Sequence, residues 1–187
     1  KNCKLLLGLK NLIINKTYNI HSKKLKKNIN NRIFLYMGFA DKKNFTNKIL
    51  VLLNNKIFDK YKIYVFSKKK ELINKYKKIK NIFFISKPKK NLKKIYLNSK
   101  IIFSSAGVSM YEQIMCKSNS VFFPQNTYQE KICKYLKRKN YIRYEKHLRN
   151  LTIKKIEDYL NIEKNYNRQF LILKNNNKKI IKSIIKV

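Results

Sequence analysis

From residue 32 onward, short runs of apolar residues alternate with segments whose apolar positions recur every three or four residues. The runs show little polar alternation, which is typical of strands that are buried on both faces. The segments between them have the spacing of amphipathic helices, such as Phe45, Ile49 and Leu52. Six runs fit this description: IFLYM (33–37), KIYVF (62–66), NIFFI (81–85), IIFS (101–104), VFF (121–123) and YIRY (141–144).

Strands that alternate with helices form parallel sheets covered by helices on both faces. The pattern therefore predicts an α/β fold with a Rossmann-like, doubly wound parallel sheet. Under the common strand order 3-2-1-4-5-6, the first and fourth strands lie side by side. Helices are expected over residues 42–54, around Leu72, Tyr76 and Ile79, around Leu92, Ile95 and Tyr96, and over residues 107–116 and 127–138.

The segments on either side of this alternating region are less regular. Residues 32–150 are predicted to form the Rossmann-like domain, and there is no internal repeat. Residues 1–31 are interpreted as an interdomain linker with a partial strand at 12–14 and a basic stretch at 22–31. Residues 151–187 are expected to form C-terminal helices that pack on the domain, because apolar pairs recur at helical spacing. Those pairs are Ile180/Ile181 and Ile184/Ile185, and the Asn tract at 175–177 is expected to break the helix before them.

The formal net charge of +37 arises from 46 Lys and Arg residues against nine Asp and Glu residues. Only five of the basic residues are arginine, the side chain that makes bidentate contacts with phosphate and guanine. Lys, Asn and Ile make up about half of the chain, and their codons consist almost entirely of A and T. The charge is therefore interpreted mainly as codon bias, and no specific nucleic-acid partner is expected. A weak contact with an anionic membrane surface is kept as an alternative role for this charge.

Other functional classes are limited by what the chain lacks. No run approaches the 18 uncharged apolar residues of a membrane span, and the apolar run at 5–7 is too short for a secretory signal. Cys3, Cys116 and Cys133 are odd in number and widely spaced, so they fit no zinc pattern and indicate a reducing compartment. A cytoplasmic location without metal or cofactor is expected.

The scarce small residues cluster in two segments that follow the first and fourth predicted strands. One is MGFAD (37–41), with Gly38 and Asp41, and the other is SSAGVSMYE (104–112), with Gly107 and Glu112. If the first and fourth strands are neighbours, both segments line one crevice at the topological switch point, where ligands of such folds bind.

This crevice has the chemistry of an anion site. Gly107 allows close approach of a ligand, and the N–H groups of Val108, Ser109 and Met110 open the following helix. Glu112 lies about one turn further on, and its carboxylate can accept two ribose hydroxyls of a nucleoside diphosphate. The alternative is that Gly107 only forms a tight turn and Glu112 is a solvated helix residue, since neither loop is a GxGxxG or Walker motif.

Four segments carry a resemblance to a known family. They resemble, in order and spacing, the C-terminal half of the UDP-sugar hydrolases of pseudaminic acid biosynthesis, which cleave UDP-2,4-diacetamido-2,4,6-trideoxy-β-L-altropyranose to UDP and the free sugar. MGFAD is similar to the GG(S/T)D loop of that family, and SAGVSMYE to its AGGST-x-(Y/W)E segment. The resemblance implies the C-terminal domain of a GT-B fold, shared with the peptidoglycan UDP-N-acetylglucosamine transferase. The segments are LLLGLKNLIINKTY (5–18), IFLYMGFADKKNFTNKIL (33–50), SSAGVSMYEQ (104–113) and FFPQNTYQEK (122–131).

The resemblance also implies a role for individual residues. Phosphate contacts would come from the turn after the fourth strand and ribose contacts from the helix behind it, while main-chain groups near Ile85 would bind uracil. Phe39 stands where the family has a second glycine, and Val108 stands where it has a small hydroxyl residue. Gln129 would face the sugar, or else is a plain surface helix residue. The implied assignments are Gly38 and Asp41 beside the diphosphate and sugar, Gly107, Val108 and Ser109 on phosphate, and Glu112 on ribose.

The family's catalytic histidine lies in a glycine-rich loop of an N-terminal domain that this chain does not contain. No catalytic residue is therefore expected here, because His21 and His147 match no family motif and are interpreted as surface histidines. The chain alone is expected to bind nucleotide weakly and to hydrolyse nothing. The missing half, as a domain or a partner chain, is the expected partner.

Three other hypotheses remain at this point. The same pocket serves the donor-binding domain of a GT-B glycosyltransferase, and the sequence does not separate it from a hydrolase. A basic nucleic-acid-binding protein would use the interleaved tyrosines and lysines of KYKKIKNIFF (75–84) as a stacking platform. However, the same residues are already predicted to form the buried face of a helix and a buried strand, which would not leave them exposed for stacking. The third hypothesis is that the chain is a catalytically inactive remnant of such an enzyme. Phe39, in place of the second glycine of the family, and the missing catalytic half suggest it.

Overall fold

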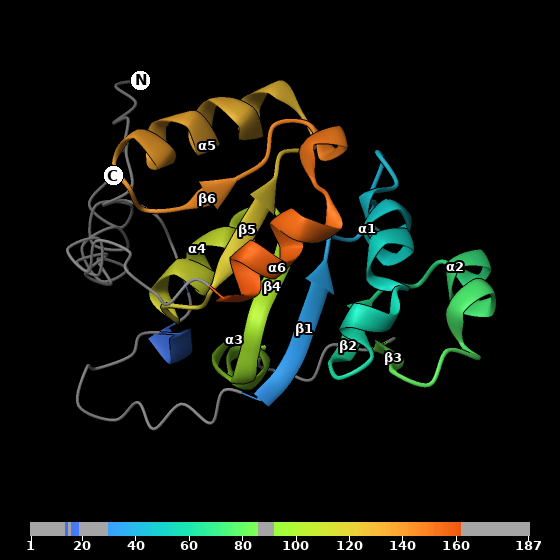
Figure 1. Ribbon diagram of the computed structural model, residues 1–187. Coiled ribbons are helices and arrows are strands. Elements are labelled where there is room, and N and C mark those ends of the chain that lie inside the picture. The colour runs from blue at the N-terminus through green and yellow to red at the C-terminus, as the bar shows by residue number, and fades with distance from the viewer. Residues whose placement is uncertain (1–13, 15, 19–29, 86–91, 162–187) are drawn as a thin grey trace, which may run out of the picture.

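The computed structural model describes residues 14, 16–18, 30–85 and 92–161 (Figure 1). The predicted strand at 12–14 falls outside this part except for Ile14, which is buried and not in a strand. The predicted break at 175–177 and the C-terminal apolar pairs also lie outside the described residues.

Six parallel strands form one sheet in the order β3-β2-β1-β4-β5-β6, which confirms the predicted doubly wound α/β fold. The two central strands are fully buried in their middle parts; Ile33 on β1 and Ile101 on β4, for example, are paired and fully enclosed. Their sequences are nearly continuous apolar runs because helices cover both faces. The strands are β1 (Asn30–Tyr36), β2 (Lys62–Phe66), β3 (Ile82–Ile85), β4 (Ser99–Ser105), β5 (Ser120–Phe123) and β6 (Arg143–Tyr144).

In the described residues an α-helix follows each strand along the chain. Residues 86–91, which the structure does not describe, lie between β3 and the helix after it. Short 3₁₀ turns also lie at Lys16–Tyr18 (η2), Lys56–Phe58 (η4) and Leu148–Asn150 (η5). The α-helices are α1 (Phe45–Leu53), α2 (Lys70–Tyr76), α3 (Lys93–Asn98), α4 (Val108–Met115), α5 (Thr127–Arg138) and α6 (Ile153–Asn161).

Two hydrophobic cores lie on the two faces of the sheet. On one face α1, α2 and α6 pack against Leu35, Val65 and Phe103, and Figure 1 shows α6 crossing in front of the central strands. On the other face η2, α3, α4 and α5 pack against Phe34 and Ile102. Because successive strand residues point to opposite faces, each central strand contributes to both cores.

Two boundaries differ from the prediction. The strand expected at 141–144 is only Arg143–Tyr144, because the Tyr141 N–H donates to the Leu136 carbonyl and closes the end of α5. β1 begins at Asn30, inside the stretch interpreted as linker.

Tyr76 and Ile82, in the lysine-rich segment considered as a stacking platform, are buried in the core, as the helix and strand interpretation predicts. Within the described residues, no helix combines the length and apolarity needed to cross a membrane.

Candidate functional site

The two glycine-containing turns meet at the carboxyl edge of the sheet. β1 and β4 are neighbours, and Tyr36 at the end of β1 pairs with Ser104 near the end of β4. Gly38 has φ +79°, a left-handed conformation that favours glycine, and a Cβ there would lie 3.2 Å from the Ser105 hydroxyl. The turn after β1 therefore packs directly on Ser105, the last residue of β4, and the turn after β4 begins beside it, as the predicted strand order requires.

Open space lies in front of Gly107. A Cβ at this position would meet no atom within 4 Å, and the φ of −91° is accessible to any residue. The fold of the described residues therefore does not itself require glycine at 107. A close approach of a ligand at this point would explain why the residue has no side chain.

The N-terminus of α4 has free donors at this edge. Gly107 is its N-cap, and no side chain of the described residues caps the helix. Val108 is 66% exposed and Ser109 is half-buried. The first N–H groups of a helix have no partner within the helix, so those of Val108 and Ser109 are available to an anion.

The Asp41 side chain forms hydrogen bonds with the backbone that follows it, at the start of α1. The side chain is 6% exposed, with Oδ1 accepting from the Phe45 N–H and Oδ2 from the Thr46 N–H, both at 2.9 Å. This carboxylate caps α1 and offsets the positive end of the helix dipole. The structure thus gives Asp41 a positioning role, and its contact with a diphosphate or sugar stays a prediction.

Replacing Asp41 by alanine is expected to lower the free energy of unfolding by about 1–2 kcal/mol, because two helix N–H groups lose their acceptor. Urea unfolding measures the loss, and Asp59→Ala is the control, since Asp59 is exposed beside η4. The control is expected to stay within about 0.5 kcal/mol of the wild type. Equal losses in the two variants would contradict the capping role.

Gln125 connects the turn after β5 to the turn after β1, and it is not among the residues predicted from the sequence. Its Nε2 donates to the Met37 carbonyl and to Asp41 Oδ1, each at 3.2 Å. The Gln125 N–H donates to Gln129 Oε1 at 2.8 Å. Gln129 therefore supports the β5 turn and is more than a plain surface residue, while its predicted contact with sugar remains untested. The one available signal was the position of Gln125 directly after a buried strand and Pro124.

Glu112 lies among three tyrosines on the face of the sheet that carries α4. The Tyr96 hydroxyl donates to Glu112 Oε2 at 3.5 Å, and Tyr18 also hydrogen-bonds the carboxylate. Tyr36, at the end of β1, is close enough for the Glu112 charge to raise its pKa after the larger effect of burial. Glu112 itself is half-buried, so it is neither a fully solvated helix residue nor sealed in the core.

Burial raises the pKa of Glu112 above its ordinary value of 4.5, and the tyrosine hydrogen bonds only partly oppose this effect. The folded state therefore holds the proton more tightly than the unfolded state, so Glu112 contributes stability at low pH that is lost as the pH rises through the raised pKa. The free energy of unfolding of the wild type, relative to Glu112→Gln, is expected to fall between about pH 4 and pH 7. Urea unfolding at both pH values measures this, and a constant difference would contradict it.

Ile85 ends β3 and is paired with Phe66 at the end of β2. The Tyr36 ring meets the Phe66 ring edge-on at 5.1 Å. Tyr36, Phe66 and Ile85 belong to the same core face as Tyr96 and α4. The carboxyl ends of β1, β2 and β3 thus form an aromatic and aliphatic floor that runs from Glu112 toward the predicted uracil position.

The remaining candidates lie elsewhere. His147 is exposed just before η5, and His21 is outside the described residues. Among described side chains, no group of three His, Cys, Asp or Glu residues is placed to hold a metal ion. A cavity of about 570 Å³ lies between α5 and β6, and none of its lining residues was predicted as a site residue.

Comparison with known proteins supports the fold. No family model matches the chain, and no curated protein matches it significantly. Among solved structures, it is similar to the UDP-GlcNAc 2-epimerase of Methanocaldococcus jannaschii, crystallised in complex with UDP-GlcNAc and UDP. The TM-score is 0.61 at 16% identity, over 85% of this chain and 46% of the epimerase, so the chain spans less than half the length of that enzyme. The chain is thus a Rossmann-like α/β domain that resembles one domain of a GT-B-like epimerase.

Proposed function

We propose that this chain is the UDP-sugar-binding domain of a nucleotide-sugar hydrolase whose catalytic half lies outside it. The observation that carries the proposal is the packing of the Gly38 turn on Ser105, which brings both glycine turns to one edge of the sheet. This edge is the topological switch point, where open α/β sheets bind their ligands.

The geometry of the described residues supports an orientation for UDP. The diphosphate would approach Gly107 and bind the N–H groups of Val108 and Ser109 at the start of α4. The ribose hydroxyls would donate to Glu112, and the uracil would lie over the floor formed by Tyr36, Phe66 and Ile85. The sugar would then lie over the turns that Asp41 and Gln125 hold together.

The resemblance to the UDP-sugar hydrolases of pseudaminic acid biosynthesis favours a diacetamido-trideoxy hexose as the sugar and hydrolysis of its bond to the diphosphate. The chain itself would supply binding groups only, and the other half would supply the general base. A GT-B glycosyltransferase or an epimerase domain would bind UDP at the same edge, so the similarity to an enzyme crystallised with UDP-GlcNAc favours the nucleotide site over any one reaction.

Calorimetric titration of the full chain with UDP, uridine and GDP tests the proposal. We expect saturable binding of UDP, weaker binding of uridine, which lacks the diphosphate, and weaker binding of GDP, whose larger base does not fit the uracil position. The high net charge makes a salt control essential, because non-specific phosphate attraction falls steeply with salt. Equal affinity for UDP and GDP that vanishes at high salt would contradict a uridine site.

A further inference from the structure

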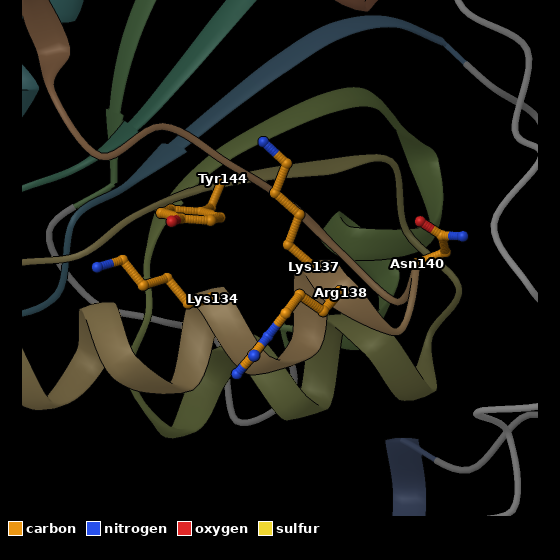
Figure 2. Close-up of a pocket in the computed structure, with 5 residues that line it drawn as sticks. All are labelled: Lys134, Lys137, Arg138, Asn140 and Tyr144. Atoms are coloured by element: carbon orange, nitrogen blue, oxygen red, sulfur yellow. The ribbon is translucent and has the colours of Figure 1, made fainter.

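A cavity of about 570 Å³ lies beside the edge strand β6, apart from the glycine turns (Figure 2). Its volume is within the range of about 300–1,000 Å³ that is usual for small-molecule sites. Figure 2 shows that its lining comes from the second half of α5, from β6 and from the connection between them. The lining residues are Lys134, Lys137, Arg138, Asn140 and Tyr144.

The charge of this cavity is not balanced by acidic groups. None of the lining residues is acidic. Glu130 is the carboxylate beside it, and it accepts from Lys134 at 2.9 Å and from Lys146 at 3.3 Å. Within the described part of the chain, Lys137 and Arg138 form no ion pair with a carboxylate. Glu130 therefore pairs with two of the four cations around this cavity, and no carboxylate of the described residues pairs with the other two.

Neutral hydrogen-bond donors lie among these cations. The Lys137 ammonium is 5.5 Å from the centroid of the Tyr144 ring, and Lys134 also interacts with Tyr144. In Figure 2 the two lysine side chains lie on either side of the ring, and the Asn140 amide lies further along the same wall. Burial raises the pKa of Tyr144, so its hydroxyl remains a donor at neutral pH.

Stabilisation of the α5 dipole explains only part of this arrangement. Lys137 and Arg138 lie in the last turn of α5, where cations are favourable in any protein. Lys134 lies a turn earlier, where it pairs with Glu130, and Tyr144 belongs to a strand, so the dipole does not account for the position of Tyr144 beside both lysines. A phosphate group matches the whole set, since it accepts bidentate bonds from a guanidinium and further bonds from ammonium, amide and hydroxyl donors.

We propose that the cavity between α5 and β6 binds the phosphate group of a phosphorylated ligand, at a site separate from the proposed UDP site. Lys134 and Lys137, which lie on either side of the Tyr144 ring, would hold the phosphate oxygens together with the Tyr144 hydroxyl, and Arg138 and Asn140 would add charge and a donor at the rim. A soluble phosphorylated molecule and a phospholipid headgroup present the same chemistry to these groups.

Titration of the full chain with inorganic pyrophosphate at about 150 mM salt, followed by NMR of the Asn140 and Tyr144 amides, tests this site. The double variant Lys137→Gln/Arg138→Gln is expected to weaken the binding that the Asn140 and Tyr144 amides report at least tenfold, in line with about two lost charged hydrogen bonds, while any binding at the start of α4 is unchanged. Lys77→Gln/Lys78→Gln is the matched control, because these lysines are exposed at the end of another helix, α2. The control is expected to change the affinity less than about twofold. Equal losses in both double variants would overturn the proposal, because they would show attraction to charge alone.

Vesicles of phosphatidylcholine with and without phosphatidylglycerol form the second arm of the test. If the cavity variant loses pyrophosphate binding and binds the vesicles as the control does, the ligand is a soluble phosphorylated molecule. If it loses only vesicle binding relative to the control, the ligand is a lipid headgroup. Unchanged binding in both arms would overturn the proposal. Thermal unfolding of both double variants verifies that they fold.

Discussion

Placing an aspartate at Gly107 is expected to abolish UDP binding while leaving the fold intact. The residue is the N-cap of α4, and aspartate is among the most favourable N-cap residues. The φ of −91° and the empty space around the Cβ position accommodate the new side chain without strain. A carboxylate at this point repels an incoming diphosphate, and like charges brought together cost several kcal/mol. Calorimetry should therefore show a loss of affinity of at least about 100-fold.

Gly107→Asn is the matched control for this variant, because it has nearly the same shape and capping ability without the charge. Its UDP affinity is expected to lie between those of the wild type and of Gly107→Asp, since the side chain obstructs the site but does not repel the ligand. The free energy of unfolding of both variants should equal or exceed that of the wild type. If Gly107→Asp binds UDP as well as the wild type does, no diphosphate approaches this turn.

The second large effect is expected at Glu112. Replacing it by alanine removes the acceptor for the ribose hydroxyls and should weaken UDP binding by about 1.5–3 kcal/mol, which is roughly 10- to 150-fold. Glu157→Ala is the control, since Glu157 lies on α6, against the opposite face of the sheet. Calorimetry measures both, and an unchanged affinity in Glu112→Ala would count strongly against a ribose contact.

Glu112 also accepts a hydrogen bond from Tyr96, which is fully buried, so alanine leaves that hydroxyl without its partner. Glu112→Gln separates the two effects because it retains the shape and an acceptor for Tyr96. If Glu112→Ala loses UDP binding and Glu112→Gln keeps nearly normal affinity, UDP binding does not depend on the negative charge of the Glu112 carboxylate. The unfolding measurements at two pH values use the same glutamine variant.

The fold could be predicted because its signal is local and repeated. Runs such as IFLYM and IIFS are almost entirely apolar, since β1 and β4 are covered on both faces, and each is followed by a helical pattern. The strand order then followed from a general preference of such sheets. The length of β6 could not be predicted, because Ile142 is buried but Tyr141 uses its N–H to close α5. An apolar run looks the same whether its backbone joins a strand or a turn.

The site was predictable only in outline. The adjacency of β1 and β4, which places the two glycine turns at the same edge of the sheet, was predicted from the usual strand order, and the structure confirms it. The role of Asp41 did not follow, because a carboxylate after a strand looks alike in sequence whether it caps a helix or faces a ligand. The contacts of Gln125 and Tyr18 depend on segments far apart in the chain, and no local pattern marks them. Tertiary contacts of this kind appear only in the folded structure.

The central claim is that UDP binds where the two glycine turns meet, and NMR titration of the amide groups tests it most directly. On addition of UDP to the full chain, the amides of Gly38, Gly107 and Ser109 are expected to shift together and to give one dissociation constant, while that of Ile156 on α6 does not move. Shifts spread over the exposed lysines without saturation, or confined to α5 and β6, would contradict the account.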